Sequence, residues 1–140
     1  MNKRKIVFRL GCILLVLCSC SEKYEANFVV KNSRKSEIVL CYGYGTLRPD
    51  TVRISPSSQS CLFSCDGMAE DKDFAFDYLY HGMSYCRLYV EDSLIAIWKS
   101  EDKREVGNFF NPDCWQKSYI RQKHGGYENG ITYVFDIMEK

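Results

Sequence analysis

The sequence predicts a small all-β domain behind an N-terminal leader. About eight short segments alternate apolar and polar residues or are rich in β-branched and aromatic residues, and turn residues separate them. Ten Tyr and eight Phe favour strands, and no long amphipathic helix competes. Several segments are apolar on both faces, which a single sheet would leave wet. We therefore expect two packed layers: a small antiparallel β-sandwich, immunoglobulin-like or transthyretin-like, or a partly open barrel.

The predicted strands follow from runs of alternating residues that end at polar or glycine-rich turns. In the first strand Phe28 and Val30 share a face, and in the second Ile38 and Leu40 do. Gly43, Gly45 and Pro49 are expected to end the second strand, and 55–58 the third. The eight predicted strands are 27–31, 37–42, 51–54, 59–65, 85–90, 94–99, 115–122 and 131–137.

The clearest predicted hairpin joins 85–90 to 94–99. Cys86, Leu88 and Val90 alternate with polar or amphipathic residues and are expected to face the core. The pair Asn129-Gly130 is a strong turn signal before the last strand. Two further strands have a predicted inner face, formed by Cys61, Phe63 and Cys65 in one and by Ile131, Tyr133, Phe135 and Ile137 in the other.

The stretch 66–84 has the weakest pattern. Its aromatic residues alternate at Phe74, Phe76, Tyr78 and Tyr80. This spacing favours an extended edge segment or a loop folded back on the core, and a helical turn is the alternative.

The leader combines a basic flank with a short apolar core. Lys3, Arg4, Lys5 and Arg9 precede an uninterrupted apolar run of nine residues from Leu10 to Cys18. A helix of that length covers roughly half of a ~30 Å hydrocarbon layer, so a cleaved signal is expected rather than a spanning helix.

The end of the leader, Leu17-Cys18-Ser19-Cys20, resembles the lipobox of bacterial lipoproteins. The resemblance implies cleavage by signal peptidase II between Ser19 and Cys20. It further implies a diacylglycerol thioether on the Cys20 thiol and acylation, such as palmitate, of the new amino terminus. An ordinary cleaved signal with an incidental cysteine is the alternative.

In that family the residue after the lipidated cysteine directs sorting, and Ser21 in place of Asp implies the outer membrane. The expected organisation is a signal peptide over 1–19, a lipidated tether over 20–25 and one β-rich domain over 26–140. The segments 27–33 and 111–115, with the ending 133–137, resemble small uncharacterised Bacteroidetes lipoproteins. That resemblance implies a location in the cell envelope and a fold, not an activity.

Charge argues against a nucleic-acid partner. Four of the 19 basic residues precede Cys20, which leaves 15 against 18 acidic residues and a net charge of −3 after cleavage. A nucleic-acid-binding domain would show a basic surplus.

Five cysteines follow Cys20, and an exported chain meets an oxidising compartment in which pairs form. Because five is odd, at least one thiol stays free or pairs outside the chain. Cys61 and Cys65 would lie about 13 Å apart in an extended strand, too far for a disulfide. Whether any disulfide forms is left open. The five are Cys41, Cys61, Cys65, Cys86 and Cys114.

Catalytic and metal motifs are weak. His81 is the candidate base for a Cys65 or Cys86 thiol, and His124 is expected in an exposed turn. The acidic residues Asp66, Glu70, Asp71 and Asp73 lack the spacing of a calcium loop. No Cys-x-x-Cys pair is present, and Cys61-x-x-x-Cys65 alone is a weak zinc signal. We therefore expect no catalytic residues, no metal site and no cofactor.

Aromatic residues in or near loops are the better candidates for a binding surface, because such rings form contacts with proteins and stack on sugars. The alternative is that most of them cap a small core. They are Tyr42, Tyr44, Tyr78, Tyr80, Phe109, Phe110 and Trp115.

The sequence thus predicts a non-enzymatic interaction module, anchored in the outer membrane through Cys20 and facing an envelope protein or a glycan. The alternatives are a small exported Cys/His-dependent enzyme and a structural subunit of an envelope complex.

Overall fold

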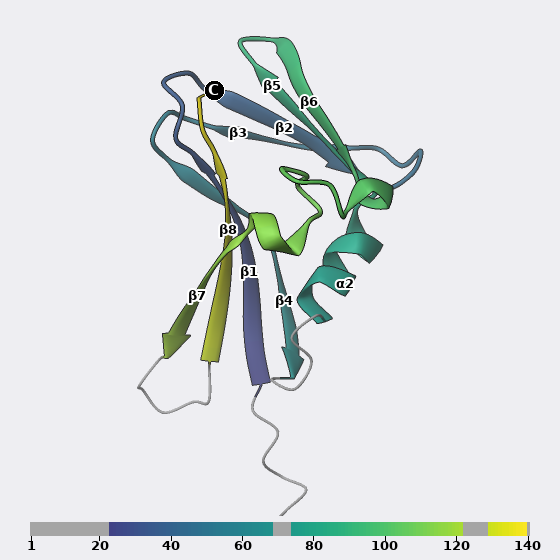
Figure 1. Cartoon of the computed structure of the whole chain (residues 1–140), viewed down its shortest axis with the longest axis vertical. Helices are drawn as coiled ribbons and strands as arrows, with labels where there is room; N and C mark the ends of the chain where they lie inside the picture. The colour runs from purple at the N-terminus through teal and green to yellow at the C-terminus, as the bar shows by residue number, and fades with distance from the viewer. Residues whose placement is uncertain (1–22, 69–73, 122–128, 140) are drawn as a thin grey trace, which may run out of the picture.

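The computed structural model describes residues 23–68, 74–121 and 129–139. Its eight strands form two open four-stranded sheets, which confirms the predicted β-sandwich class (Figure 1). The strands are β1 (Lys23–Asn32), β2 (Ile38–Gly43), β3 (Asp50–Ile54), β4 (Gln59–Met68), β5 (Tyr85–Val90), β6 (Ser93–Lys99), β7 (Gln116–Arg121) and β8 (Asn129–Ile137).

The first sheet, called sheet A, has the order β4-β1-β8-β7, and the second, sheet B, has the order β3-β2-β5-β6. All pairs are antiparallel except β1 and β8, which run parallel. Sheet B crosses the upper half of sheet A, and the lower half of sheet A extends beyond it (Figure 1).

Strand β1 begins earlier than predicted. Lys23 pairs with Met68, and Glu25 pairs with both Asp66 and Gly130. The expected tether over 20–25 therefore overlaps the sheet by three residues, because backbone pairing on both sides of β1 extends the strand past its apolar pattern.

The core contains a cluster of aromatic rings packed on the inner face of sheet A. The ring of Phe28 stacks on those of Phe63 and Tyr133, with centroids 4.6 and 5.0 Å away. It meets Phe76 and Trp115 edge to face, both at 5.3 Å. These offset and edge-to-face contacts are the arrangements that aromatic quadrupoles favour.

The predicted β5–β6 hairpin is confirmed, and Cys86, Leu88 and Val90 face the core. The register shifts at Ile95, so that Leu88 pairs with Ala96 and Tyr89 with Leu94. The inner face predicted for the last strand is also confirmed, with Tyr133, Phe135 and Ile137 buried and Ile131 packed against the core.

The stretch after β4 contains a helix, α2 (Phe74–Gly82), and not an extended segment. Ala75, Phe76, Leu79 and Met83 recur at helical spacing and are buried, whereas Tyr78 is exposed. The strand-like alternation of aromatic residues misled the prediction because large apolar residues also occur on both sides of this helix.

Two local expectations were wrong. In β4 the register shifts between Phe63 and Cys61, so Leu62 is an extra residue and packs against the core. This bulge turns Cys61 to solvent, away from the face that buries Cys65. Asn129-Gly130 does not form a turn but begins β8, where it pairs with Arg121 and Ile120.

Candidate functional site

The seven aromatic candidates do not form one surface. Tyr44 and Tyr78 are exposed, and Tyr42 and Tyr80 are half-buried. The other three are buried in the core, which corrects the expectation that they belong to an exposed surface; they are Phe109, Phe110 and Trp115.

Two buried asparagines turn the 108–115 segment inward. The Asn108 side chain accepts a hydrogen bond from the Phe110 N–H at 2.8 Å and donates to the Asp102 carbonyl at 3.0 Å. The Asn111 side chain accepts from the Asp113 N–H and donates to the Glu105 carbonyl, both at 3.0 Å. These side chains form hydrogen bonds with backbone N–H and C=O groups of the segment and of the residues before it. The aromatic rings can therefore be buried without leaving those backbone groups unpaired.

A hollow of about 460 Å³ lies between α2 and the segment 103–113, and Tyr80 lines it. The Tyr80 hydroxyl donates to the Phe110 carbonyl at 3.0 Å, and the Lys103 ammonium lies 4.3 Å from the Tyr80 ring centroid. The chain's own lysine therefore occupies the face of this ring that a ligand would use.

The side chain of His81 is held by its own helix. Its Nδ1 lies 2.6 Å from the Asp77 carbonyl oxygen, four residues earlier in α2. Cys65 and Cys86 lie in the core. Burial raises the pKa of the Cys86 thiol, with a smaller contribution from Cys41, and burial likewise raises the pKa of Cys65. Raised pKa values suppress the thiolate that a nucleophile needs, and His124 lies outside the described residues.

The five described cysteines are free thiols. Within the described ranges, His, Cys, Asp and Glu side chains form no group of three that would hold a metal ion. Asp66 is the described member of the predicted acidic cluster; Glu70, Asp71 and Asp73 lie outside the described residues. Ser19 and Cys20, the predicted cleavage and lipidation residues, lie outside them as well.

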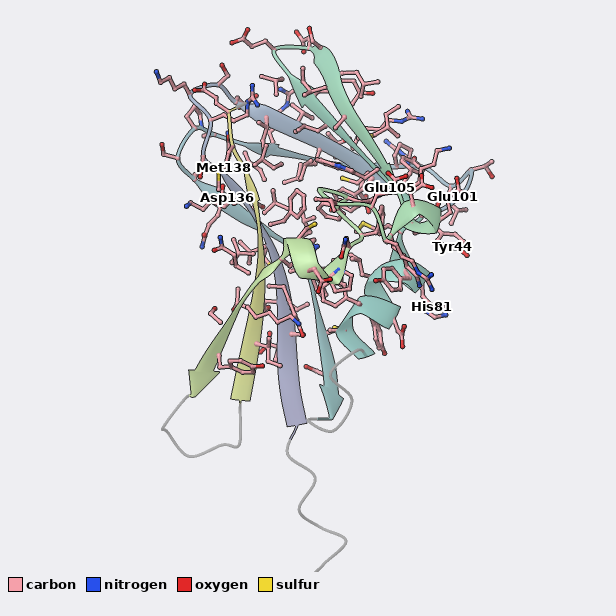
Figure 2. All side chains as sticks on the ribbon, in the orientation of Figure 1. Tyr44, His81, Glu101, Glu105, Asp136 and Met138 are labelled. Carbon is pink, nitrogen blue, oxygen red and sulfur yellow. The ribbon has the colours of Figure 1, made fainter. Side chains whose placement is uncertain are left out.

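A groove of about 660 Å³ lies between the outer side of β6 and the upper end of β8 and is here called the β6–β8 groove. Ile95 and Ile97 of β6 form one side, and Met138 follows β8 on the other. Val106, which is 99% exposed, stands at its rim on the loop after η1 (Ser100–Asp102). In Figure 2, Asp136 and Met138 lie at the end of β8, and Glu105 lies across from them near the end of β6.

The groove results from the order of the strands in the two sheets. β6 is the last strand of sheet B, and β7 pairs with β8 only between Asn129 and Val134. Two strand edges therefore have no strand partner on this side of the sandwich. One is the outer edge of β6, and the other is the end of β8 over residues 135–137. The short 3₁₀ helix η2 (Pro112–Cys114) lies within the segment 108–115, which leads directly into β7.

The charged groups of the groove are mostly acidic. Asp136 is 11% exposed and pairs through Oδ2 with the Lys31 ammonium at 3.3 Å. Arg34 donates from Nη1 to the Met138 carbonyl at 3.1 Å. Asp102 and Glu105 also line the groove, and the described residues place no basic side chain in an ion pair with either.

Sequence reasoning did not single out Ile95, Ile97, Val106 or Met138. The available signal was β6 itself, where Leu94, Ile95, Ala96, Ile97 and Trp98 are apolar without alternation. Such a run is typical of a strand that is buried on both faces. Only the sheet order reveals that β6 is an edge strand.

No described helix has the length and apolar character needed to cross a bilayer. Comparison with protein-family models, with curated proteins and with solved structures found no match.

Proposed function

We propose that the chain is a lipoprotein, anchored by acyl chains on Cys20, whose β-sandwich is a non-enzymatic interaction module at the outer envelope. Support for the anchor comes from the basic flank, the short apolar run and the Leu17-Cys18-Ser19-Cys20 sequence. Each buried CH₂ contributes about 0.8 kcal/mol, so two or three acyl chains would hold the protein firmly.

The observation that carries the interaction role is the grouping of exposed apolar side chains around one groove. Nine large hydrophobic residues are exposed in the described chain, and four of them line the β6–β8 groove. A soluble surface seldom groups such side chains unless they contact another molecule.

The parallel pair β1 and β8 sets the expected orientation. Only Ser21 and Glu22 separate Cys20 from β1, so the domain would begin within about 11 Å of the anchor. Eight steps along β1, about 26 Å, separate Lys23 from Lys31, the partner of Asp136. The groove would therefore face away from the membrane, where a partner has access.

A structural subunit of an envelope complex is the second candidate. It is favoured by the same edge of β6, which has no strand partner among the described residues. The enzyme alternative has less support, because the His81 ring contacts the backbone carbonyl of Asp77 and the Cys65 and Cys86 thiols are buried.

Detergent phase partition of the protein expressed in a lipoprotein-processing bacterium tests the anchor. We expect the wild-type chain in the detergent phase and Cys20→Ala in the aqueous phase. Cys12→Ala, which alters a leader cysteine too early for cleavage, should partition as wild type. Aqueous partition of the wild-type chain would overturn the anchor and leave the groove untouched.

A further inference from the structure

We infer that the β6–β8 groove binds an extended segment of a partner protein, which adds a fifth strand to sheet B along β6. The segment presents apolar side chains to the groove and Lys or Arg to Asp102 and Glu105. This inference rests on the proposed interaction role and names the chemistry of the partner at that site.

The backbone of β6 provides the first argument. β5 pairs with one side of β6 throughout its length, and no described strand pairs with the other. The described hydrogen bond on that side comes from the Asn108 side chain, 3.4 Å from the Lys99 carbonyl at the end of the strand. An extended peptide satisfies such an edge by continuing the ladder.

Side chains provide the second argument. Ile95 and Ile97, both about half exposed, lie along the edge, and Val106 and Met138 stand opposite. Trp98 and Ala96 are half-buried beneath them and pack against the core. Alternate residues of an added strand point to the same face about 6.7 Å apart, so its apolar residues would cover this surface repeatedly.

Charge selects the kind of partner. Lys31 forms an ion pair with Asp136, and Arg34 donates a hydrogen bond to the Met138 carbonyl. Among the described residues, Asp102 and Glu105 form no ion pair with a basic side chain. The lining of the groove therefore holds more carboxylates than basic groups, and Asp102 and Glu105 lie just beyond Lys99, which pairs with Glu101. A segment that alternates apolar residues with Lys or Arg complements both its surface and its charge.

A second copy of this chain fits less well. Glu91 and Asp92 precede β6, and Glu101 and Asp102 follow it. If β6 paired along its full length with its own copy, Ser93 would face Lys99 and Glu91 would face Glu101. Like charges would then meet at both ends of the new pair, which destabilises it.

Two synthetic peptides of about ten residues test the inference on the full chain purified in detergent. One alternates Val with Lys and Thr, and the other has Glu in place of each Lys. Titration calorimetry measures affinity, and amide hydrogen exchange identifies the strand that becomes protected. We expect the basic peptide to bind at least about tenfold more tightly and to protect β6 amides.

Surface variants locate the contact. The double variant Ile95→Asn with Val106→Asn should weaken the basic peptide at least about tenfold, and so should Glu105→Lys. The matched controls are Leu47→Asn, an exposed apolar residue outside the groove, and Glu25→Lys, an exposed acid at the other end of β1. Both controls should bind as wild type.

Three results would overturn the inference: equal affinity for the two peptides, protection away from β6, and no binding at millimolar peptide. Concentration-dependent dimerisation abolished by the Ile95/Val106 double variant would also overturn it in favour of a second copy. Because none of these readouts depends on acylation, failure here is separable from failure of the membrane anchor.

Discussion

The Trp115 indole N–H donates to the Phe109 carbonyl oxygen at 2.6 Å, and both residues are buried. Their rings also meet edge to face, with centroids 4.9 Å apart. This pair joins Trp115, the residue before β7, to Phe109 in the same 108–115 segment. Asn108 and Cys114 of this segment line the β6–β8 groove, so the buried contact between Trp115 and Phe109 positions one side of the groove.

Removing that hydrogen bond should destabilise the fold. Trp115→Phe leaves the buried Phe109 carbonyl without its donor, and we expect a loss of about 1–3 kcal/mol of unfolding free energy. Trp98→Phe is the control, because Trp98 is half-buried and contributes ring contacts with Phe109 and Phe135. Urea unfolding followed by circular dichroism measures both. An equal loss in the two variants would show that ring volume, and not the hydrogen bond, is what matters.

Asn32 joins three segments from a fully buried position. Its Nδ2 donates to the carbonyls of Ser36 and Ile54, each at 2.9 Å, and its Oδ1 accepts from the Arg34 N–H at 3.0 Å. Asn32→Ala leaves these groups unsatisfied and should cost about 2–4 kcal/mol. The same change at the less buried Asn27 should cost less than half as much in the same urea titration. A tolerant Asn32→Ala would mean that water replaces the side chain.

The hairpin β5–β6 and the inner face of β8 were predictable, because alternation at residues such as Leu88 and Tyr133 reflects the side-chain period of a strand. Helix α2 was not, since Phe74, Phe76, Tyr78 and Tyr80 fit a strand as well as a helix, and packing of Leu79 against the core decided between them. The bulge at Leu62 and the inward turn at Asn108 depend on contacts between distant segments. For the same reason, only the topology places Ile97 and Met138 beside one groove.

Alkaline pH should destabilise the protein through Cys86. Because burial raises its pKa, the folded state keeps the proton while the unfolded state releases it above about pH 8.5. Stability is therefore complete below that pH and falls as pH rises, by up to about 1.4 kcal/mol per pH unit for this group.

The check is urea unfolding between pH 7 and pH 10 under reducing conditions. Cys86→Ala should flatten the slope above pH 8.5, although its stability at pH 7 is lower. Cys61→Ala, which removes an exposed thiol, should keep the wild-type slope. An unchanged slope in Cys86→Ala would assign the pH dependence to other groups.

Thiol labelling should follow burial. In the native protein Cys61 is exposed and should react with a neutral disulfide reagent within minutes, whereas Cys86 should react only on unfolding. Peptide mapping after timed quenching identifies each site. Rapid native labelling of Cys86 would contradict the packing of β5 against the core.

The most direct test of the central claim is the intact mass of the protein extracted from membranes, beside Cys20→Ala. The account predicts a chain that starts at Cys20 and carries a diacylglycerol group with one further acyl chain, all absent from the variant. A mature chain that starts elsewhere, or an unmodified Cys20, would contradict it.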